Sequence, residues 1–517
     1  MVAWAVARRI RRREVLAGLG AAAVAACCRR APAVLRGLPA APEAVQAGDL
    51  DRGRARLWAR AAAPGRLRVE WWGPGDRDGH RVDGPRVDAG TDLCGAVEVA
   101  GLPAGDVRYQ VSLEADDGGV SAATPGRLRV RGAGEPFLLA WSGDVCGQGW
   151  GIDPRRGGLP AFAALRRLAP DLFVHSGDAV YADVPIEAAV RLPGGGLWRN
   201  LTTAAKAKVA ETQAEFWGNH AYNLLDEHYR GLLAEVAMIA QWDDHETLNN
   251  WYPGQRLDDD RYQVRDVDTL AARARRAFLD YFAVRRGPDD RIWRAARPHP
   301  DVEVIVLDAR SARGRNGAGR DAAAGPATAM LGATQAAWLV ETLAASTATW
   351  KIVACDQPLG LVIPDGPPPP DGAGRQEGFA QGDPGPPLGR EHEVAAILAG
   401  LRARGVRNVV WLTADVHYAA AHRYDPARAA FHDFDPFWEL VAGPLHAGAF
   451  GPNPLDPTFG PEVVFARAPT PAQFGSGPAG GLMSFGALAY QPRDRALVAR
   501  LHGGDGAVLW ERALAPA

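Results

Sequence analysis

The feature of this sequence that most constrains its fold is a set of six short apolar runs, each of which ends in an aspartate. Apolar strands without polar alternation require a sheet that is covered on both faces. Ligands bind outside the carboxyl ends of the strands in open α/β sheets, so the six runs could bring their aspartates to one edge. The runs end at Asp144, Asp178, Asp243 with Asp244, Asp308, Asp356 and Asp415.

Helical segments are expected between these runs. Residues 157–169, 271–284 and 333–345 have the length and composition of helices. The C-terminal segments GALAYQP, ALVARLHG and AVLWERAL are strand-like, which predicts that part of the sheet is antiparallel. Together these patterns predict an α/β domain over residues 137–515. Within it, the Pro- and Gly-rich residues 362–390 are typical of a lid or binding loop.

A second domain is expected before residue 137. The chain has 517 residues, which exceeds the usual size of one hydrophobic core. Residues 40–132 hold short alternating segments separated by Gly, Pro and Asp, a pattern that predicts a small all-β sandwich. The expected fold class is therefore α/β (α+β), preceded by a small all-β sandwich domain, with the boundary at residues 132–136.

Residues 1–28 have the pattern of an export signal. Five arginines in the first 14 positions precede an apolar run that is shorter than the roughly 20 residues needed to span a bilayer. The pair Arg12-Arg13 is typical of the twin-arginine type, with an ordinary Sec signal as the alternative. Cys27 follows small residues, as in a lipoprotein cleavage site. We therefore expect the twin-arginine export machinery as a partner, a periplasmic or extracellular location, and membrane attachment only through a lipid on Cys27.

Composition disfavours several other classes of protein. Hydrophobic residues make up 47% of the chain and charged residues 23%, which are globular values that argue against wholesale disorder. The formal net charge of −2 argues against stable nucleic-acid binding, which needs a basic surface. The five cysteines have no dense spacing, so the chain is not a disulfide scaffold despite the expected export.

The strand-terminal aspartates suggest a metal site. Several ionised carboxylates can share a water-poor cleft only where cations neutralise them, and metal ions are the simplest such cations. An aspartate after a strand can instead be a turn former or a helix N-cap, which we expect for Asp308 and Asp356. The other aspartates are accompanied by further ligand types, so we expect a metal-binding role for them.

Three motifs supply these ligand types. One puts a carboxylate and a phenol three residues apart, one surrounds an imidazole with two carboxylates, and one places a carboxylate and an imidazole on the same face of an extended chain. Carboxylate and imidazole together suit Zn²⁺, iron or Mn²⁺, and additional oxygens admit Ca²⁺. The motifs are Asp178 with Tyr181, Asp243 and Asp244 with His245, and Asp415 with His417.

The order of these motifs resembles that of the calcineurin-like metallophosphatases, and more closely that of the PhoD-like phosphatases, the alkaline phosphatase D family. The segments that carry the resemblance are SGDVCGQGWGI, HSGDAVYAD, WDDHETLNNW, LTADVHYAAAHRY and AGPLHAGAFGPN. The likeness covers about residues 40–515. It implies a metallophosphatase-like sheet sandwich flanked by helices, with the small all-β sandwich domain at 40–132 in front of a catalytic domain at 137–515.

The resemblance also implies an activity and a set of metals. Members of the family are exported phosphomonoesterases, often with phosphodiesterase activity, and their metal cluster is built on Fe³⁺ with Ca²⁺. Carried over to this chain, Asp178 would bridge the metals and Tyr181 would bind the iron-like ion. Asp415 and His417 would complete that site.

Two further positions follow from the resemblance, and one departs from it. Asp244 stands where the wider superfamily has a metal-binding Asn, and His245 stands where it has the catalytic His. The best-known members have a Cys directly after the Ser of the first motif, whereas this chain has Ser142-Gly143-Asp144, with Cys146 two residues later. Either Asp144 replaces the thiolate or Cys146 bends in, and we favour Asp144. Loss of the soft ligand leaves Mn²⁺, Zn²⁺ or an all-Ca²⁺ site as alternatives to iron.

A mechanism follows from the charge of the substrate. A phosphate ester repels an anionic nucleophile, so we expect paired metals to neutralise it and to lower the pKa of a bound water to about 7. A metal-bound hydroxide would then attack phosphorus while His245 stabilises or protonates the leaving oxygen. Arg310 would either bind a phosphoryl oxygen or form a structural salt bridge. Two other functions stay open: a metal-dependent esterase of another class, and a non-catalytic surface binding protein on the same fold.

Overall fold

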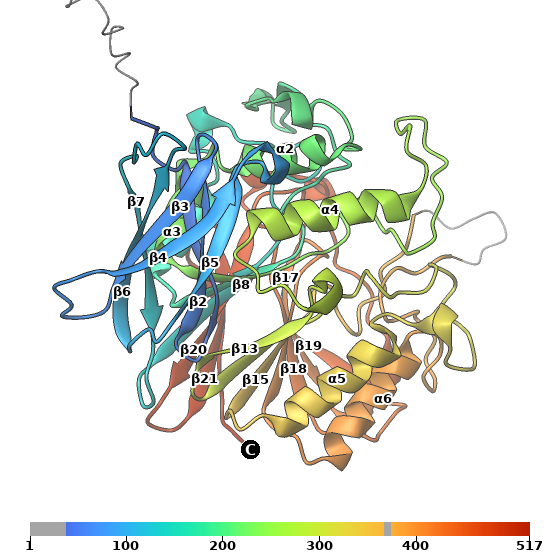
Figure 1. The fold of residues 1–517 in the computed structure, drawn as a ribbon. Helices are drawn as coiled ribbons and strands as arrows, with labels where there is room; N and C mark the ends of the chain where they lie inside the picture. Colours follow the sequence, from blue (N-terminus) through green and yellow to red (C-terminus); the bar gives the residue numbers. More distant parts are fainter. Residues whose placement is uncertain (1–37, 367–373) are drawn as a thin grey trace, which may run out of the picture. The chain divides into compact units, whose positions relative to one another are not determined.

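The computed structural model describes residues 38–366 and 374–517 (Figure 1). The expected signal segment at 1–28, with Cys27, lies outside these residues, so export stays a prediction. Among the helices of the described residues, none combines the length and the apolar character needed to cross a bilayer.

The first large sheet joins strands from both ends of the described chain. Within residues 38–366 and 374–517 it has nine strands, in the order β22 (Val508–Leu514), β21 (Ala496–Gly503), β20 (Ser484–Gln491), β8 (Phe137–Ser142), β9 (Leu172–Ser176), β12 (Ala237–Gln241), β1 (Ala44–Asp51), β2 (Arg54–Arg60) and β5 (Cys94–Ala100). The central strands β8, β9 and β12 are parallel neighbours. The C-terminal strands β20, β21 and β22 pair antiparallel, as the sequence predicts.

The second large sheet is formed by the middle of the chain. Its seven strands in the described ranges lie in the order β13 (Arg294–His299), β14 (Val302–Val306), β15 (Trp350–Ala354), β16 (Val409–Thr413), β18 (Phe437–Val441), β17 (Ala419–Tyr424) and β19 (Pro461–Arg467). β14, β15, β16 and β18 are parallel. The six aspartate-terminated runs of the sequence all form strands of these two sheets.

The two sheets pack face to face because their central strands are apolar on both sides. In β9, Leu172 belongs to the hydrophobic cluster that the two sheets share, whereas the next residue, Phe173, belongs to the cluster on the outer face. In β15, Ile352 lies in the shared cluster and Val353 in the outer one. This period of two is the expected pattern for a strand that is covered on both faces.

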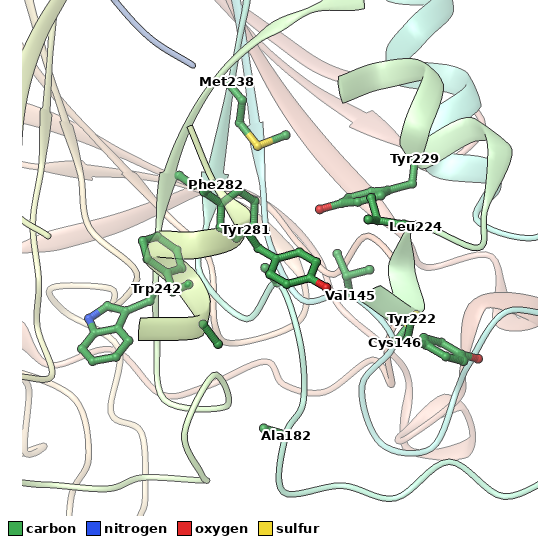
Figure 2. Close-up of a cluster of buried hydrophobic side chains, with 14 of the residues drawn as sticks. Val145, Cys146, Ala182, Tyr222, Leu224, Tyr229, Met238, Trp242, Tyr281 and Phe282 are labelled. Carbon is green, nitrogen blue, oxygen red and sulfur yellow. The ribbon is translucent and has the colours of Figure 1, made fainter. Parts of the chain in front are cut away.

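Helices cover the outer faces of the sandwich. They are α1 (Pro160–Leu168), α2 (Gln213–Asn223), α3 (Glu227–Glu235), α4 (Val267–Tyr281), α5 (Gly332–Ala345) and α6 (Glu391–Ala403). Side chains of α1 to α4 pack on the nine-stranded sheet around Phe173 and Met238, and Figure 2 shows part of this cluster. Side chains of α5 and α6 pack on the seven-stranded sheet around Val353 and Trp411. The predicted sheet sandwich flanked by helices is thereby confirmed.

The strands of residues 40–132 divide between two sheets. A four-stranded antiparallel sheet has the order β4 (His80–Val87), β3 (Gly65–Trp72), β6 (Gly105–Glu114) and β7 (Thr124–Val130). This is the expected N-terminal all-β layer, but β1, β2 and β5 are strands of the nine-stranded sheet. Residues 39–517 form one compact unit. The expected separation of 40–132 from 137–515 stays a prediction about independent folding.

Ile352 provides a test of the sheet-to-sheet packing. Its side chain is 0% exposed between the two sheets. We expect Ile352→Ala to lower the free energy of unfolding by about 2–5 kcal/mol, because the smaller side chain leaves a cavity that the two sheets cannot close. The measurement is urea-induced unfolding followed by tryptophan fluorescence. Val463→Ala in β19, where the side chain is 50% exposed, is the control and should change stability by less than about 0.5 kcal/mol. Equal losses in both variants would contradict the assigned core.

Candidate metal centre

The predicted aspartates lie in the loops that follow four strands. The loops after β8, β9 and β12 leave the nine-stranded sheet, and the loop after β16 leaves the seven-stranded sheet. Three of the aspartates have a left-handed backbone, with φ of 64° at Asp144, 48° at Asp178 and 63° at Asp415. This conformation turns the chain sharply and is uncommon outside glycine, so its recurrence at strand ends is typical of a functional site.

Three groups of side chains bring candidate ligand atoms within 4.8 Å of one another. Two aspartates are each shared by two groups, so the three groups form one continuous cluster. The groups are Asp144, Asp178 and His417; Asp178, Asp244 and His245; and Asp243, Asp244 and Asp415. The structure thus brings together every carboxylate and imidazole that the sequence proposes as a ligand. Asp415 and His417, which the resemblance puts in one site, belong to different groups of this cluster.

His417 has the contacts of a positioned ligand. Its Nε2 lies 2.9 Å from the hydroxyl of Tyr181 and 3.3 Å from Oδ1 of Asp144. Its Nδ1 faces the carbonyl oxygen of Gly448, which favours a proton on Nδ1 and leaves Nε2 as the electron-pair donor. The phenol of Tyr181, which the resemblance puts beside the iron-like ion, therefore lies against His417. Tyr181 is fully buried.

The structure places Asp144, and not Cys146, in the cluster. Oδ2 of Asp144 is buried without a hydrogen-bond partner. Cys146 instead lies in the hydrophobic cluster beneath the helices, together with Val145, Tyr222 and Leu224 (Figure 2). Burial raises the pKa of the Cys146 thiol to about 12, so it carries a proton at neutral pH and is a poor ligand.

Glu246 joins two of the strand-end loops. Its carboxylate accepts hydrogen bonds from the backbone N–H groups of Asp178 and Ala179 at 3.2 and 2.7 Å. It also accepts one from the N–H of Asp243 at 2.9 Å. The close approach of the loops requires Gly177, whose φ is +84° and where a Cβ would lie 2.6 Å from Cβ of Asp243. Glu246 was within reach of sequence reasoning, since it ends the DDHE motif, but its role depends on the fold.

His245 is oriented by a residue that the sequence did not single out. Its Nδ1 lies 2.7 Å from Oδ1 of Asp183, and Oδ2 of Asp183 accepts a hydrogen bond from the N–H of Asn249. Burial opposes protonation of His245, but the carboxylates of Asp183, Asp244 and Asp178 outweigh it and raise the imidazole pKa well above its usual value. Asp183 stands five residues after Asp178, and no pattern in the sequence links it to His245.

Arg310 is the cation of the carboxylate cluster. Its guanidinium lies 2.5 Å from Oδ1 of Asp243 and also pairs with Glu377. The side chain is 0% exposed and does not line the cavity over the site. Arg310 therefore forms the salt bridges of the structural alternative, and its contact with substrate stays a prediction. The carboxylates within 3.9 Å of it are Asp243, Asp244, Asp356, Glu377 and Asp415.

The two aspartates assigned to turns differ from each other. Asp308 accepts hydrogen bonds from the N–H groups of Arg310 and Ser311 at 3.0 and 2.9 Å, as expected of a turn former. Asp356 does not behave in this way. Its side chain is fully buried and lies 3.7 Å from Nε of Arg310, so it belongs to the buried charge cluster.

A cavity of about 430 Å³ lies over the cluster. Its polar part is formed by Asp178, Asp244, His245, Asp415 and His417. The Pro- and Gly-rich segment 362–390 contributes Ile363, Pro364 and Glu377 to its wall, as expected for a loop that lines a site. Glu377 is a second residue that sequence reasoning missed, because nothing around it in the sequence distinguishes it from an ordinary loop glutamate.

The electrostatics of the cluster fit bound cations. Burial raises the pKa values of Asp178, Asp243 and Asp415 above the usual carboxyl range, and neighbouring carboxylates add to the effect. Burial acts in the same direction on Asp244, but Arg310 and His245 outweigh it and lower its pKa to about 2. Oδ2 of Asp144, Oδ2 of Asp243 and Oδ1 of Asp244 are buried without hydrogen-bond partners. Such unpaired oxygens are costly unless a cation contacts them, so the residues present fit a metal site.

Comparisons with known proteins show the family of the chain and relatives of its fold. A family model described as PhoD-like phosphatase matches residues 139–500. Alkaline phosphatase D of Bacillus subtilis (strain 168) is 26% identical over 205 residues, which cover 38% of this chain and 34% of that enzyme. The solved structure of PhoD has a TM-score of 0.66 at 17% identity and covers 93% of this chain and 94% of its own. A purple acid phosphatase from yellow lupin (Lupinus luteus) has a TM-score of 0.57 at 12% identity, covering 91% and 73%.

Replacement of Arg310 tests its structural role. We expect Arg310→Met to lower the free energy of unfolding by about 3–5 kcal/mol, because it leaves buried carboxylates without their cation. Arg404→Met is the control, since Arg404 forms an exposed ion pair with Glu341. This variant should lose at most about 1 kcal/mol of the free energy of unfolding. Chemical denaturation measures both. An Arg310→Met protein of wild-type stability that binds phosphate esters more weakly would favour the substrate role instead.

Removal of metal should make stability depend on pH. Burial raises the pKa of Glu246 to about 7, whereas an unfolded glutamate has a pKa of about 4.3. The folded metal-free protein therefore binds the carboxyl proton of Glu246 more tightly than the unfolded chain does. The resulting stabilisation is lost as the pH rises through 7. We expect the free energy of unfolding of EDTA-treated protein to fall between pH 5 and pH 7.5, and Glu246→Gln to reduce the fall.

The control for this experiment is the metal-loaded protein. Bound cations stabilise the ionised carboxylates around Glu246. The unfolding free energy of the metal-loaded protein should therefore fall less over the same pH range. Equal pH dependence with and without metal would contradict the assignment of the cluster to cations.

Proposed function

The chain belongs to the PhoD-like phosphatase family, and on this basis we propose that it is a metal-dependent phosphoric ester hydrolase. It acts on phosphomonoesters and, by extension, on phosphodiesters. The observation that carries the proposal is the convergence of strand-end carboxylates with His417 beneath a cavity. The name of its partial relative, alkaline phosphatase D, supports the same class of reaction.

The chain offers two adjoining sets of metal ligands. Asp144, Asp178 and His417 form one set, with Tyr181 beside it. Asp178 and Asp244 belong to the second, so Asp178 is shared by the two sets and would contact the metal ions of both. Metal ions held there would supply the positive charge that a phosphate ester requires and would activate water. The family resemblance implies Fe³⁺ with Ca²⁺, but oxygen and nitrogen donors without a thiolate also suit Mn²⁺ or Zn²⁺.

His245 is the proposed proton donor to the leaving group. The hydrogen bond between its Nδ1 and Asp183 fixes the ring and leaves Nε2 for a substrate. When the bond between phosphorus and the leaving oxygen breaks, that oxygen gains negative charge and can take the proton from the imidazole. Asp183 is a positioning residue in this scheme, because it acts only through His245.

Export is part of the proposal. It rests on the arginines and the short apolar run of residues 1–28, which fit the twin-arginine machinery. A lipid on Cys27 would hold the protein at the membrane after export, and cleavage beyond Cys27 would release it into the periplasm or the medium.

Substitutions at Asp178 and His245 separate metal binding from proton transfer. Asp178→Asn removes a negative charge from between two cations, so metal content and activity should fall together by a large factor. His245→Ala should keep its metal and lose kcat by roughly 10²–10⁴-fold. The loss should be larger for an alkyl phosphate than for p-nitrophenyl phosphate, whose phenolate leaves without a proton. Elemental analysis and steady-state kinetics on both substrates are the measurements.

Two controls complete the test. A His245→Ala protein with depleted metal, or with equal losses on both substrates, would remove His245 from the proton-donor role. Wild-type protein is assayed in parallel on a carboxylic ester. Hydrolysis of that ester alone would indicate an esterase of another class, and hydrolysis of neither ester would indicate a binding protein.

A further inference from the structure

Five aromatic or imidazole rings follow one another through the site. His245 and Tyr181 have ring centroids 4.1 Å apart, and the ring of Tyr181 is 6.3 Å from that of His417. The ring of Phe450 lies 5.1 Å from His417, and that of Phe474 lies 5.2 Å from Phe450. The proposed proton donor His245 and the pair Phe450–Phe474 are therefore at opposite ends of the row, with the candidate ligand His417 between them.

Phe450 and Phe474 line the cavity from two loop segments that are joined by backbone hydrogen bonds. The N–H of Ala449 donates to the carbonyl of Ser476 at 2.9 Å, and the N–H of Gly475 donates to the carbonyl of Ala449 at 2.8 Å. Phe474 is nevertheless 63% exposed. A large aromatic side chain at a cavity rim, held in place and uncovered, offers a surface for an apolar or aromatic group.

The charge of the cavity adds a second constraint. None of the described residues that line it is a lysine or an arginine, and Arg310 is engaged below it. A dianionic monoester would thus find no lysine or arginine of this lining to pair with, whereas a diester carries only one negative charge. The apolar residues Ile363, Pro452 and Pro454 line the same cavity as the two phenylalanines.

We propose that Phe450 and Phe474 form a subsite for an apolar or aromatic substituent that stays on phosphorus, so that diesters bearing such a group are preferred substrates. The inference rests on the proposed phosphoric ester hydrolase function. In the reaction, water adds to phosphorus and the bond to the leaving oxygen breaks. That oxygen departs as an alcohol with a proton from the His245 end, and the monoester that remains keeps its apolar substituent on the phenylalanines.

The test compares two diesters with the same leaving group, methyl p-nitrophenyl phosphate and phenyl p-nitrophenyl phosphate. Because p-nitrophenolate departs from both, their ratio of kcat/KM reports the retained substituent alone. We expect the wild-type protein to favour the phenyl diester by about tenfold or more, as aromatic packing on two rings predicts. Phe474→Ala should lower this ratio toward 1, mainly by raising KM for the phenyl diester. Phe450→Ala should bring the ratio closer to 1 than Phe474→Ala does.

Controls keep the two proposals distinguishable. Leu225→Ala removes another large exposed apolar side chain, 48% exposed and outside the cavity lining, and should keep the wild-type ratio. If the protein hydrolyses p-nitrophenyl phosphate and both diesters but the ratio is near 1, or is unchanged in Phe474→Ala, the subsite is disproved while the hydrolase function stands. If none of the three esters is hydrolysed by metal-loaded protein, the hydrolase function itself fails. Because Phe474 lies at the surface, a folding defect in Phe450→Ala would leave the Phe474→Ala result decisive.

Discussion

Buried negative charge that must be compensated governs the structure of this protein. The strand ends bring the carboxylates of Asp144, Asp178, Asp244 and Asp415 to one place, and burial penalises the ionised forms of Asp178 and Asp415 there. Arg310 supplies permanent positive charge beneath the cluster. The oxygens that Arg310 and the backbone leave without partners are the ones that metal ions would contact. The site and the surrounding core therefore stabilise each other.

The rigidity of the site comes from contacts between loops and not from the sheets alone. Glu246 ties the loop after β12 to the loop after β9 through the backbone N–H groups of Asp178 and Ala179. Asp183 fixes the ring of His245, and the carbonyl of Gly448 fixes the ring of His417. Each of these groups sets the direction in which a ligand or proton donor points, which is the role that outer partners have in metal sites generally. The cavity walls, in contrast, are built from loops with apolar and amide side chains, where substrate preference would be decided.

Much of the fold could be predicted because its signals are local. The six apolar runs became strands, the helices predicted at 157–169, 271–284 and 333–345 correspond to α1, α4 and α5, and the C-terminal segments pair antiparallel. Helices α2, α3 and α6 of the described residues lie outside these three predicted segments. The all-β layer before the sandwich was predicted, but the entry of β1, β2 and β5 into the nine-stranded sheet was not. The alternation of residues within a strand carries no information about its partner strand.

The sequence by itself determined which residue types stand at the strand ends, because an apolar run followed by Asp, His or Tyr can be read locally. It therefore predicted which residues stand at the candidate ligand positions. That these residues bind metal is still a prediction. Only the tertiary structure decided the directions of those side chains. It put Asp144 in the cluster and the Cys146 thiol in the hydrophobic core, and it turned Arg310 toward protein carboxylates. It also brought Asp183 and Glu377 to the site across 62 and 67 residues from His245 and Arg310. Contacts over such separations depend on how whole sheets pack, and no local pattern records them.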